Sequence, residues 1–134
     1  MSANGELTGL LILCIDNEPE ILKGMEAMLT GWGCHVLTAA SLEEVIDLID
    51  KQGHSPDGII ADYHLDSGTG IDVIEECRKR YNADLHSIIA TADRSRSVQT
   101  LAEKRNIHIL RKPLKPAALR ALLSQWSARQ VAAE

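Results

Sequence analysis

Short apolar runs alternate with longer amphipathic stretches five times along this chain of 134 residues, and this alternation restricts the possible folds more than any other feature. The runs predict strands over residues 10–15, 34–39, 58–61, 87–91 and 107–110. The first run, LLILCI, is apolar throughout, which is typical of a strand covered on both faces in a parallel sheet. Five strand-then-helix units predict an α/β domain, with a doubly wound, five-stranded parallel sheet and right-handed crossovers that place helices on both faces.

Local signals predict a helix after each strand. Pro19, a favoured first-turn residue, begins a helix that ends near Gly31. Ser41 and Glu44 form a capping box for the second helix, and Pro116 begins the last helix. Apolar residues at helical spacing predict the two helices between them, with Ile71, Ile74 and Cys77 in the third and Val98, Leu101 and Ala102 in the fourth. We expect one domain over residues 9–128, a disordered tail over 1–8 and a C-terminal tail over 129–134.

Charge and cysteine content argue against several classes of function. The net charge of −5 opposes a general nucleic-acid binder, and the basic run of Arg94, Arg96, Lys104 and Arg105 is interpreted as a solvated face. The longest apolar run is too short to span a bilayer, and the polar N-terminus does not resemble a secretory signal. Three cysteines without a C-x-x-C pair argue against a disulfide framework. We therefore expect buried free thiols and a cytoplasmic protein without direct membrane contact.

The carboxyl ends of the predicted strands carry the residues with the most reactive side chains. Asp16 follows the first strand, Asp62 the third and Lys112 the fifth, and Thr91 ends the fourth. Ligands bind at this edge of an open parallel sheet, at the point where the strand order reverses. In the order 2-1-3-4-5 the first and third strands are neighbours, so we expect Asp16 and Asp62 to lie side by side.

Two adjacent carboxylates repel each other unless a cation lies between them. Mg²⁺ suits such a place because it takes few carboxylates and keeps several waters. A carboxylate nucleophile beside Mg²⁺, with an ammonium group and a hydroxyl opposite, is equipped for phosphoryl transfer. The same residues would suit a structural metal site, and Asp and Asn are also common in ordinary turns and caps. Their shared position at one edge favours the phosphoryl-transfer interpretation.

Four segments resemble, in order and spacing, the receiver domain of two-component response regulators: IDNEPEIL, ADYHLDSGTGID, ATAD and RKPLKPAAL. The resemblance covers residues 10–126 and implies the flavodoxin-like (βα)5 fold. It implies that Asp62 is the phosphoacceptor, that Thr91 and the backbone of Ala92 bind the phosphoryl group, and that Lys112 pairs with it. The peptide bond between Lys112 and Pro113 is expected to be cis.

The resemblance also implies a site for Mg²⁺ or Mn²⁺. Its ligands would be Asp16, Asn17, Asp62 and the backbone carbonyl of His64. Receivers usually carry a second acidic residue where this chain has Asn17, so we expect the loss of one negative charge to weaken metal binding.

Further positions differ from the usual receiver pattern or vary within it. Ile109 replaces the Tyr or Phe that moves inward with the threonine in many receivers, so any switching would depend on Thr91 and the loop that follows it. His64 and Asp93 lie two residues beyond Asp62 and Thr91, at places that tune the lifetime of the acyl phosphate in the family. The sequence does not predict how long the acyl phosphate of this chain would last.

Two other functions stay open as alternatives. A phosphohydrolase with an aspartyl nucleophile generally needs a second Asp two positions on, where this chain has His64. A pseudo-receiver would be a protein-interaction module whose phosphorylation is weakened or lost, and Asn17 and Ile109 are the residues that suggest it.

The resemblance implies a histidine kinase or a histidine phosphotransfer domain as the partner, docking near the first helix and Asp62. The D-N-E-P and K-P-L-K-P patterns resemble C-terminal receivers of hybrid sensor kinases. A stand-alone regulator and a receiver cut from a longer protein both remain possible. We expect no nucleic-acid partner, and a monomer or a weak homodimer.

Overall fold

A five-stranded parallel sheet forms the centre of the structure, a computed structural model that describes residues 7–66 and 68–133 and the side chains among them up to Ser127. Its strands are β1 (Leu11–Ile15), β2 (His35–Ala39), β3 (Gly58–Asp62), β6 (His86–Thr91) and β7 (His108–Arg111). They are arranged in the order β2-β1-β3-β6-β7, which is the predicted 2-1-3-4-5 order when these five are counted along the chain. Each strand end lies within one residue of its predicted position, so the predicted α/β fold is confirmed.

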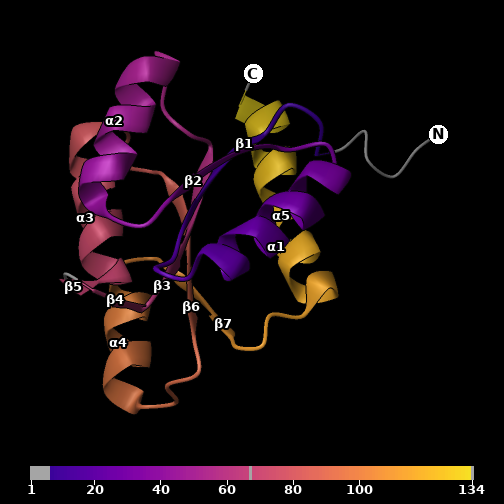
Figure 1. Ribbon diagram of the computed structural model, residues 1–134. Coiled ribbons are helices and arrows are strands. Elements are labelled where there is room, and N and C mark those ends of the chain that lie inside the picture. Colours follow the sequence, from indigo (N-terminus) through magenta and orange to yellow (C-terminus); the bar gives the residue numbers. More distant parts are fainter. Residues whose placement is uncertain (1–6, 67, 134) are drawn as a thin grey trace.

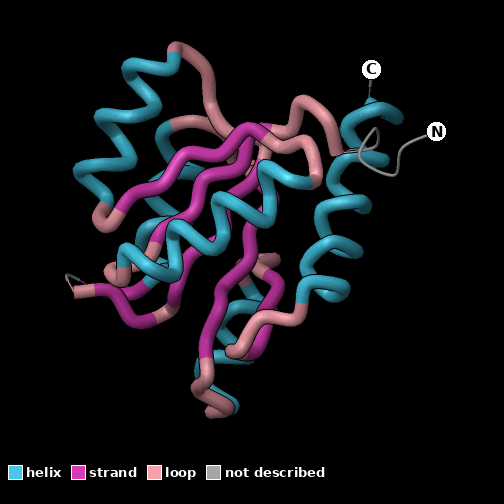
Figure 2. Tube along the Cα trace, turned by 45° about the vertical axis from the view of Figure 1, so that its right-hand side comes forward, coloured by secondary structure: helices cyan, strands magenta, loops and turns pink. Residues whose placement is uncertain are grey.

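Five helices cover the two faces of the sheet, as the alternation predicted. They are α1 (Pro19–Gly31), α2 (Leu42–Gln52), α3 (Gly70–Arg80), α4 (Arg96–Lys104) and α5 (Pro116–Ala133). Figure 1 shows α1 and α5 on one side of the sheet and α2, α3 and α4 on the other. The turned view in Figure 2 shows the strands lying between these two helical layers.

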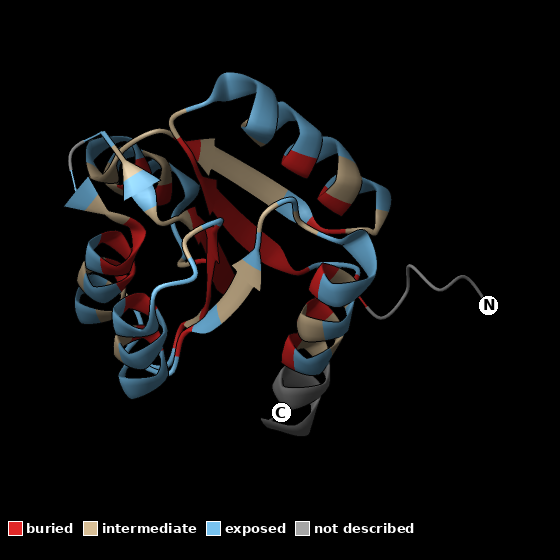
Figure 3. Ribbon diagram, turned by 90° about the horizontal axis from the view of Figure 1, so that it is seen from below, coloured by how far each residue is buried: buried red, intermediate tan, exposed pale blue. Residues whose placement is uncertain are grey.

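Alternate residues of each strand enter two separate cores, which explains the continuous apolar runs. In β3, Ile59 and Ala61 pack against α2, α3 and α4, whereas Ile60 packs against α1 and α5. Figure 3 shows the resulting band of buried residues in the central strands, with exposed residues on the outer helix surfaces. Each fully buried Leu or Ile contributes about 1.5–3 kcal/mol. No helix among the described residues has the length and apolar character needed to cross a membrane.

The structure differs from the expected domain boundaries at both ends. Leu7 is fully buried, and its apolar side chain belongs to the core that lies between the sheet and helices α1 and α5. The described fold therefore begins before residue 9, and residues 1–6 of the expected tail lie outside the described residues. At the other end, α5 continues to Ala133, past the expected boundary at 128.

A short hairpin between β3 and α3 is the element that the periodicity of the sequence does not indicate. It pairs β4 (His64–Leu65) with β5 (Gly68–Thr69) in an antiparallel ladder, with His64 opposite Thr69. Thr69 also caps α3, since its hydroxyl accepts from the backbone N–H of Asp72 while the Asp72 carboxylate accepts from the N–H of Thr69. The hairpin leads the chain from Asp62 directly into α3.

The three cysteines are expected to resist alkylation in the folded protein. All three are free and buried, and burial raises the pKa of Cys14 to about 12 and those of Cys34 and Cys77 to about 11. The thiolate is the reactive form, so iodoacetamide at neutral pH should modify native protein very slowly and modify all three thiols after denaturation. Intact mass spectrometry measures the extent of modification. Rapid labelling of any native cysteine would contradict the buried arrangement.

Candidate functional site

Asp16, Asp62 and Lys112 meet at the carboxyl edge of the sheet. Asp16 directly follows β1, Asp62 is the last residue of β3 and Lys112 directly follows β7. The Lys112 Nζ atom lies 2.6 Å from Asp62 Oδ1 and 3.4 Å from Asp16 Oδ2. The Asp16 and Asp62 side chains are only 7% and 11% exposed. Three strand ends therefore bring two largely buried carboxylates to one ammonium group, which is the grouping that the strand order predicts.

The Lys112 ammonium partly neutralises this pair of carboxylates. Burial by itself lowers the pKa of Lys112, but the hydrogen bond and charge of Asp62, supported by Asp16, outweigh burial and raise the pKa above its ordinary value of 10.5. Lys112 is therefore charged at neutral pH. Because folding raises this pKa, the contribution of the Lys112 charge to stability is complete at neutral pH and is lost as the pH rises through the raised value, above 10.5.

The residues that follow β1 are held by hydrogen bonds to backbone N–H groups. Asp16 Oδ1 accepts from the N–H of Glu18 at 3.0 Å, a local turn that orients the carboxylate. Asn17 Oδ1 accepts from the N–H of Asp66 at 3.2 Å, which ties the loop after β1 to the β4–β5 hairpin. The amide oxygen of Asn17, a candidate metal ligand, thus accepts one hydrogen bond from a residue 49 positions further along the chain and has a second lone pair.

The side-chain oxygens available here fit Mg²⁺ better than a metal ion that takes all of its ligands from protein side chains. Among the described residues, no three His, Cys, Asp or Glu side chains form a group that could hold a metal ion. Mg²⁺ typically uses one or two carboxylates and completes its shell with waters. Asp16 and Asp62 provide two carboxylates at neighbouring strand ends, beside an open groove that admits solvent. The candidate backbone ligand, His64, begins the hairpin two residues beyond Asp62.

Thr91 ends β6, the strand next to β3, and its side chain is buried. Its Oγ1 accepts from the N–H of Asp93 at 2.9 Å, and its carbonyl accepts from the N–H of Lys112 at 3.0 Å. A hydroxyl that accepts one hydrogen bond still has a hydrogen to donate. The backbone thus holds Thr91 and Lys112 together on adjacent strands, with Ala92 exposed just beyond them.

The candidate tuning residues lie around the entrance to this edge. The N–H of Ser95 donates to Asp93 Oδ1, and this hydrogen bond, followed by the charges of His64 and Arg111, lowers the pKa of the Asp93 carboxyl. The ring of His64 meets that of Tyr63 edge-on, with 4.9 Å between ring centroids. Ile109 is partly buried against the core shared by α2, α3 and α4. The Lys112–Pro113 peptide bond is cis, the isomer that the resemblance implies.

Gly70 supports Asp62 by close contact, a role that the sequence pattern does not reveal. A Cβ atom at Gly70 would clash with the backbone oxygen of Asp62 and would lie 2.9 Å from Ile89 Cδ1. In the structure Gly70 begins α3 against the end of β3, which only a residue without a side chain permits.

Gly70→Ala is expected to destabilise the fold by about 1–3 kcal/mol, because the added methyl group must displace the backbone of Asp62 or the Ile89 side chain. Urea unfolding measures the change. Gly24→Ala is the matched control, since nothing lies within 4 Å of a Cβ atom there and Ala is the better helix former inside α1. The Gly24 variant should be as stable as the wild type or more so. Equal stability for both variants would contradict the tight contact.

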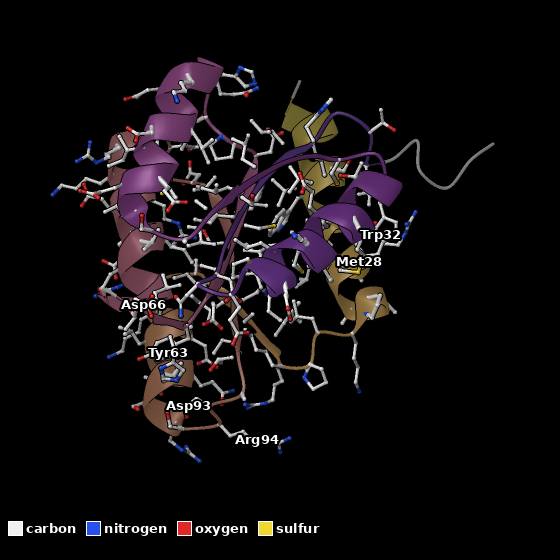
Figure 4. The ribbon with its side chains drawn as sticks, in the orientation of Figure 1. Met28, Trp32, Tyr63, Asp66, Asp93 and Arg94 are labelled. Atoms are coloured by element: carbon white, nitrogen blue, oxygen red, sulfur yellow. The ribbon has the colours of Figure 1, made fainter. Side chains whose placement is uncertain are left out.

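An apolar groove of about 610 Å³ runs from the carboxylates along α1. Its apolar lining comes from α1, from the segment that follows Lys112 and from the central strands, and comprises Ile21, Leu22, Met25, Met28, Pro113, Leu114, Cys14, Ile15, Ile60 and Ala90. Ile21 is 40% exposed, and among the described residues it is the one large hydrophobic residue that is exposed. Figure 4 shows Met28 on α1 and Trp32 directly after the end of α1, both beside α5. The groove places an apolar surface directly beside the charged cluster.

Comparison with known proteins finds matches over most of the chain. The family described as "Response regulator receiver domain" matches residues 12–124. The transcriptional regulatory protein KdpE of Mycobacterium tuberculosis is 35% identical over 68% of this chain and 39% of its own length. The phyllosphere-induced regulator PhyR of Methylorubrum extorquens is 29% identical over 85% of this chain and 42% of its own length. The chain thus spans about two fifths of the length of these relatives.

A solved structure shows the same architecture. The response regulator receiver domain protein from Clostridium thermocellum has a TM-score of 0.83 and 28% identity, and the match covers 93% of this chain and 99% of that one.

Proposed function

Since this chain belongs to the response regulator receiver domain family, we propose that it accepts a phosphoryl group on Asp62 from a phosphohistidine donor, in Mg²⁺-dependent two-component phosphorelay signalling in the cytoplasm. The observation that carries the proposal is the convergence of Lys112 on Asp62 and Asp16, at 2.6 Å and 3.4 Å. A nucleophile, a charge-stabilising ammonium and a second carboxylate are the groups that this reaction requires.

In the proposed reaction, an oxygen of the Asp62 carboxylate attacks the phosphorus atom of the donor. The new P–O bond forms an acyl phosphate, the P–N bond breaks, and the electron pair of that bond returns to the donor imidazole. Lys112 stabilises the negative charge on the transferring oxygens, and the Thr91 hydroxyl donates a hydrogen bond to the bound group. Asp16 and Asp62 would hold Mg²⁺, which would supply further positive charge. The domain in this way catalyses its own phosphorylation and the later hydrolysis, and no separate substrate turns over.

The apolar groove supports a protein as the phosphoryl donor. It begins at Asp62 and continues along Ile21, Met25 and Met28 of α1, so a helix that carries a phosphohistidine could pack its apolar side chains there while the phosphoryl group meets Asp62. Exposed apolar surface beside a reactive group is typical of a docking site. The proposed partner is a histidine kinase or a histidine phosphotransfer domain.

Phosphoryl uptake from a small donor tests the proposal directly. Wild-type protein incubated with acetyl phosphate and Mg²⁺ should gain the mass of one phosphoryl group, and excess EDTA should prevent the gain. Hydroxylamine should remove the group, because it cleaves acyl phosphates. A folded protein that gains no mass under any of these conditions would instead support the alternative function, a pseudo-receiver interaction module. The neutral side chain of Asn17, whose oxygen already accepts one hydrogen bond, and the aliphatic Ile109 are the observations that favour this alternative.

Asn17→Asp is expected to lower the Mg²⁺ concentration needed for half-maximal uptake by roughly ten-fold. A unit charge about 5 Å from a divalent ion contributes about 1.5 kcal/mol even in water. A Mg²⁺ titration of the uptake rate measures the change. Asn82→Asp is the matched control, because it adds the same charge in the turn before β6, at the opposite edge of the sheet. An equal effect of both substitutions would show that net charge, and not position 17, governs metal binding.

A further inference from the structure

The sulfur-bearing residues of the described chain differ in how far they are open to solvent. They are Cys14, Cys34, Cys77, Met25 and Met28. Met1, the remaining methionine, lies outside the described residues. All three cysteines and Met25 are buried. Met28 is only partly buried against the core between the sheet and helices α1 and α5. Among the described residues, Met28 is therefore the sulfur-bearing residue most open to solvent.

The chemistry of the thiols adds to the protection that burial gives them. A thiol reacts with an oxidant as its thiolate, and burial raises the pKa of Cys14 to about 12 and those of Cys34 and Cys77 to about 11. Almost no thiolate is present at neutral pH. A thioether has no proton to lose, so its oxidation depends on access alone. A dissolved oxidant should therefore react with Met28 first.

Met28 lines the apolar groove that begins at the phosphoacceptor. It lies seven residues after Ile21, two turns further along the same face of α1. Because an α-helix rises 1.5 Å per residue, Met28 is about 14 Å along the axis from Pro19, the first residue of α1. Figure 4 shows Met28 on the part of α1 that lies beside α5. A change at Met28 should thus alter the groove and leave the pair of Asp62 and Lys112 intact.

We propose that Met28 is an oxidation site for hydrogen peroxide, and that its sulfoxide makes the groove unfavourable for apolar ligands. The thioether sulfur attacks one oxygen of the peroxide, so that an S–O bond forms as the O–O bond breaks. The sulfur loses two electrons, and the departing hydroxide takes the proton from the transferred oxygen and leaves as water. The product, methionine sulfoxide, is polar, and covering its oxygen with an apolar group costs free energy.

The consequence for signalling rests on the proposed function, in which apolar side chains of a protein donor pack in this groove. Oxidation of Met28 would weaken the docking of that donor. A small donor such as acetyl phosphate does not need the groove and would still reach Asp62. Methionine sulfoxide reductases reverse the oxidation, so the modification would separate the domain from its donor for a time without damage to the phosphoacceptor.

Peptide mass mapping tests whether Met28 is the site of oxidation. In about 10 mM hydrogen peroxide at neutral pH, native protein should gain oxygen at Met28 at least about ten-fold faster than at Met25 or at any of the three cysteines. In guanidinium chloride, Met25 and Met28 should react at similar rates, because both thioethers are then open to solvent. Faster oxidation of Met25 or of a cysteine in the native protein would overturn the proposal.

Nile red, an uncharged apolar dye that fluoresces more strongly in apolar surroundings, measures the effect on the groove. Its Kd for wild-type protein should rise at least about five-fold after peroxide treatment, and methionine sulfoxide reductase should restore the original value. Met28→Leu should show the same Kd before and after treatment. Met25→Leu is the matched control, because it removes the buried thioether of the same groove. It should keep the rise that peroxide causes.

Three results with the dye would overturn the proposal. They are no binding to untreated protein, an unchanged Kd once Met28 is fully oxidised, and a Met28→Leu variant that still loses affinity after peroxide. Acetyl phosphate separates this proposal from the proposed function. Oxidised and untreated wild-type protein should take up the phosphoryl group at the same rate. A loss of uptake in the oxidised form alone would contradict the confined effect of Met28, whereas no uptake by either form would contradict the proposed function only.

Discussion

Asp62→Asn is expected to reduce phosphoryl uptake from acetyl phosphate below detection. The neutral amide is a far weaker nucleophile than a carboxylate, and the variant also removes the negative charge that lies 2.6 Å from Lys112. Intact mass spectrometry with Mg²⁺ present measures the effect. The fold should survive, because Asn has nearly the same size as Asp and Lys112 keeps Asp16 as a partner at 3.4 Å.

Asp66→Asn is the matched control for this substitution. Asp66 is an exposed carboxylate on the hairpin that follows β3, and its hydrogen bond to Asn17 is donated by its backbone N–H, which the substitution retains. This variant should gain a phosphoryl group to the same extent as the wild type. If the Asp62 variant gained the group as well, the nucleophile would have to be another residue.

Lys112→Ala is expected to slow phosphoryl uptake by about 100-fold or more, the usual cost of removing one preorganised group that stabilises charge in a transition state. The substitution also leaves Asp16 and Asp62, both largely buried, without the cation that separates them. Mg²⁺ should therefore raise the Tm of the variant more than that of the wild type, because the metal would replace the missing positive charge. Uptake kinetics and thermal unfolding with and without Mg²⁺ measure the two effects.

Lys115→Ala provides the comparison for Lys112→Ala. Lys115 is exposed and lies three residues after Lys112, in the same segment between β7 and α5. It is not part of the cluster that Asp16, Asp62 and Lys112 form. Its loss changes the net charge equally and should leave both the uptake rate and the Mg²⁺ response of the Tm close to wild-type values. A Lys112 variant that behaved in the same way would mean that the ammonium group has no part in the transfer.

The framework of the site was predictable because the signals for it are local. The uninterrupted apolar run of β1 indicates a strand buried on both faces, and the alternation of strands with helices then determines which strands are neighbours. Once β1 and β3 are adjacent, Asp16 and Asp62 must lie at the same edge of the sheet. The residue that follows β7 reaches that edge for the same reason, and in the structure Lys112 contacts both carboxylates.

Other features depend on contacts between distant residues and have no local signal. The hydrogen bond between Asn17 and Asp66 joins the loop that follows β1 to the β4–β5 hairpin, and the two residues are 49 positions apart in the sequence. The need for glycine at position 70 arises from the backbone of Asp62, which no pattern of apolar residues encodes. Leu7 sits in a polar segment that resembles a loose end, and only the packing of α1 and α5 shows that it is buried.

The most direct test of the central claim is to identify the residue that carries the phosphoryl group. Borohydride reduces an aspartyl phosphate to homoserine, so reduction of the phosphorylated wild-type protein, followed by peptide mass mapping, marks the acceptor permanently. We predict homoserine at position 62 alone, and only in samples that contained Mg²⁺. Homoserine at another position, including 16 or 66, or a phosphorylated protein whose residue 62 remains aspartate after reduction, would contradict the account.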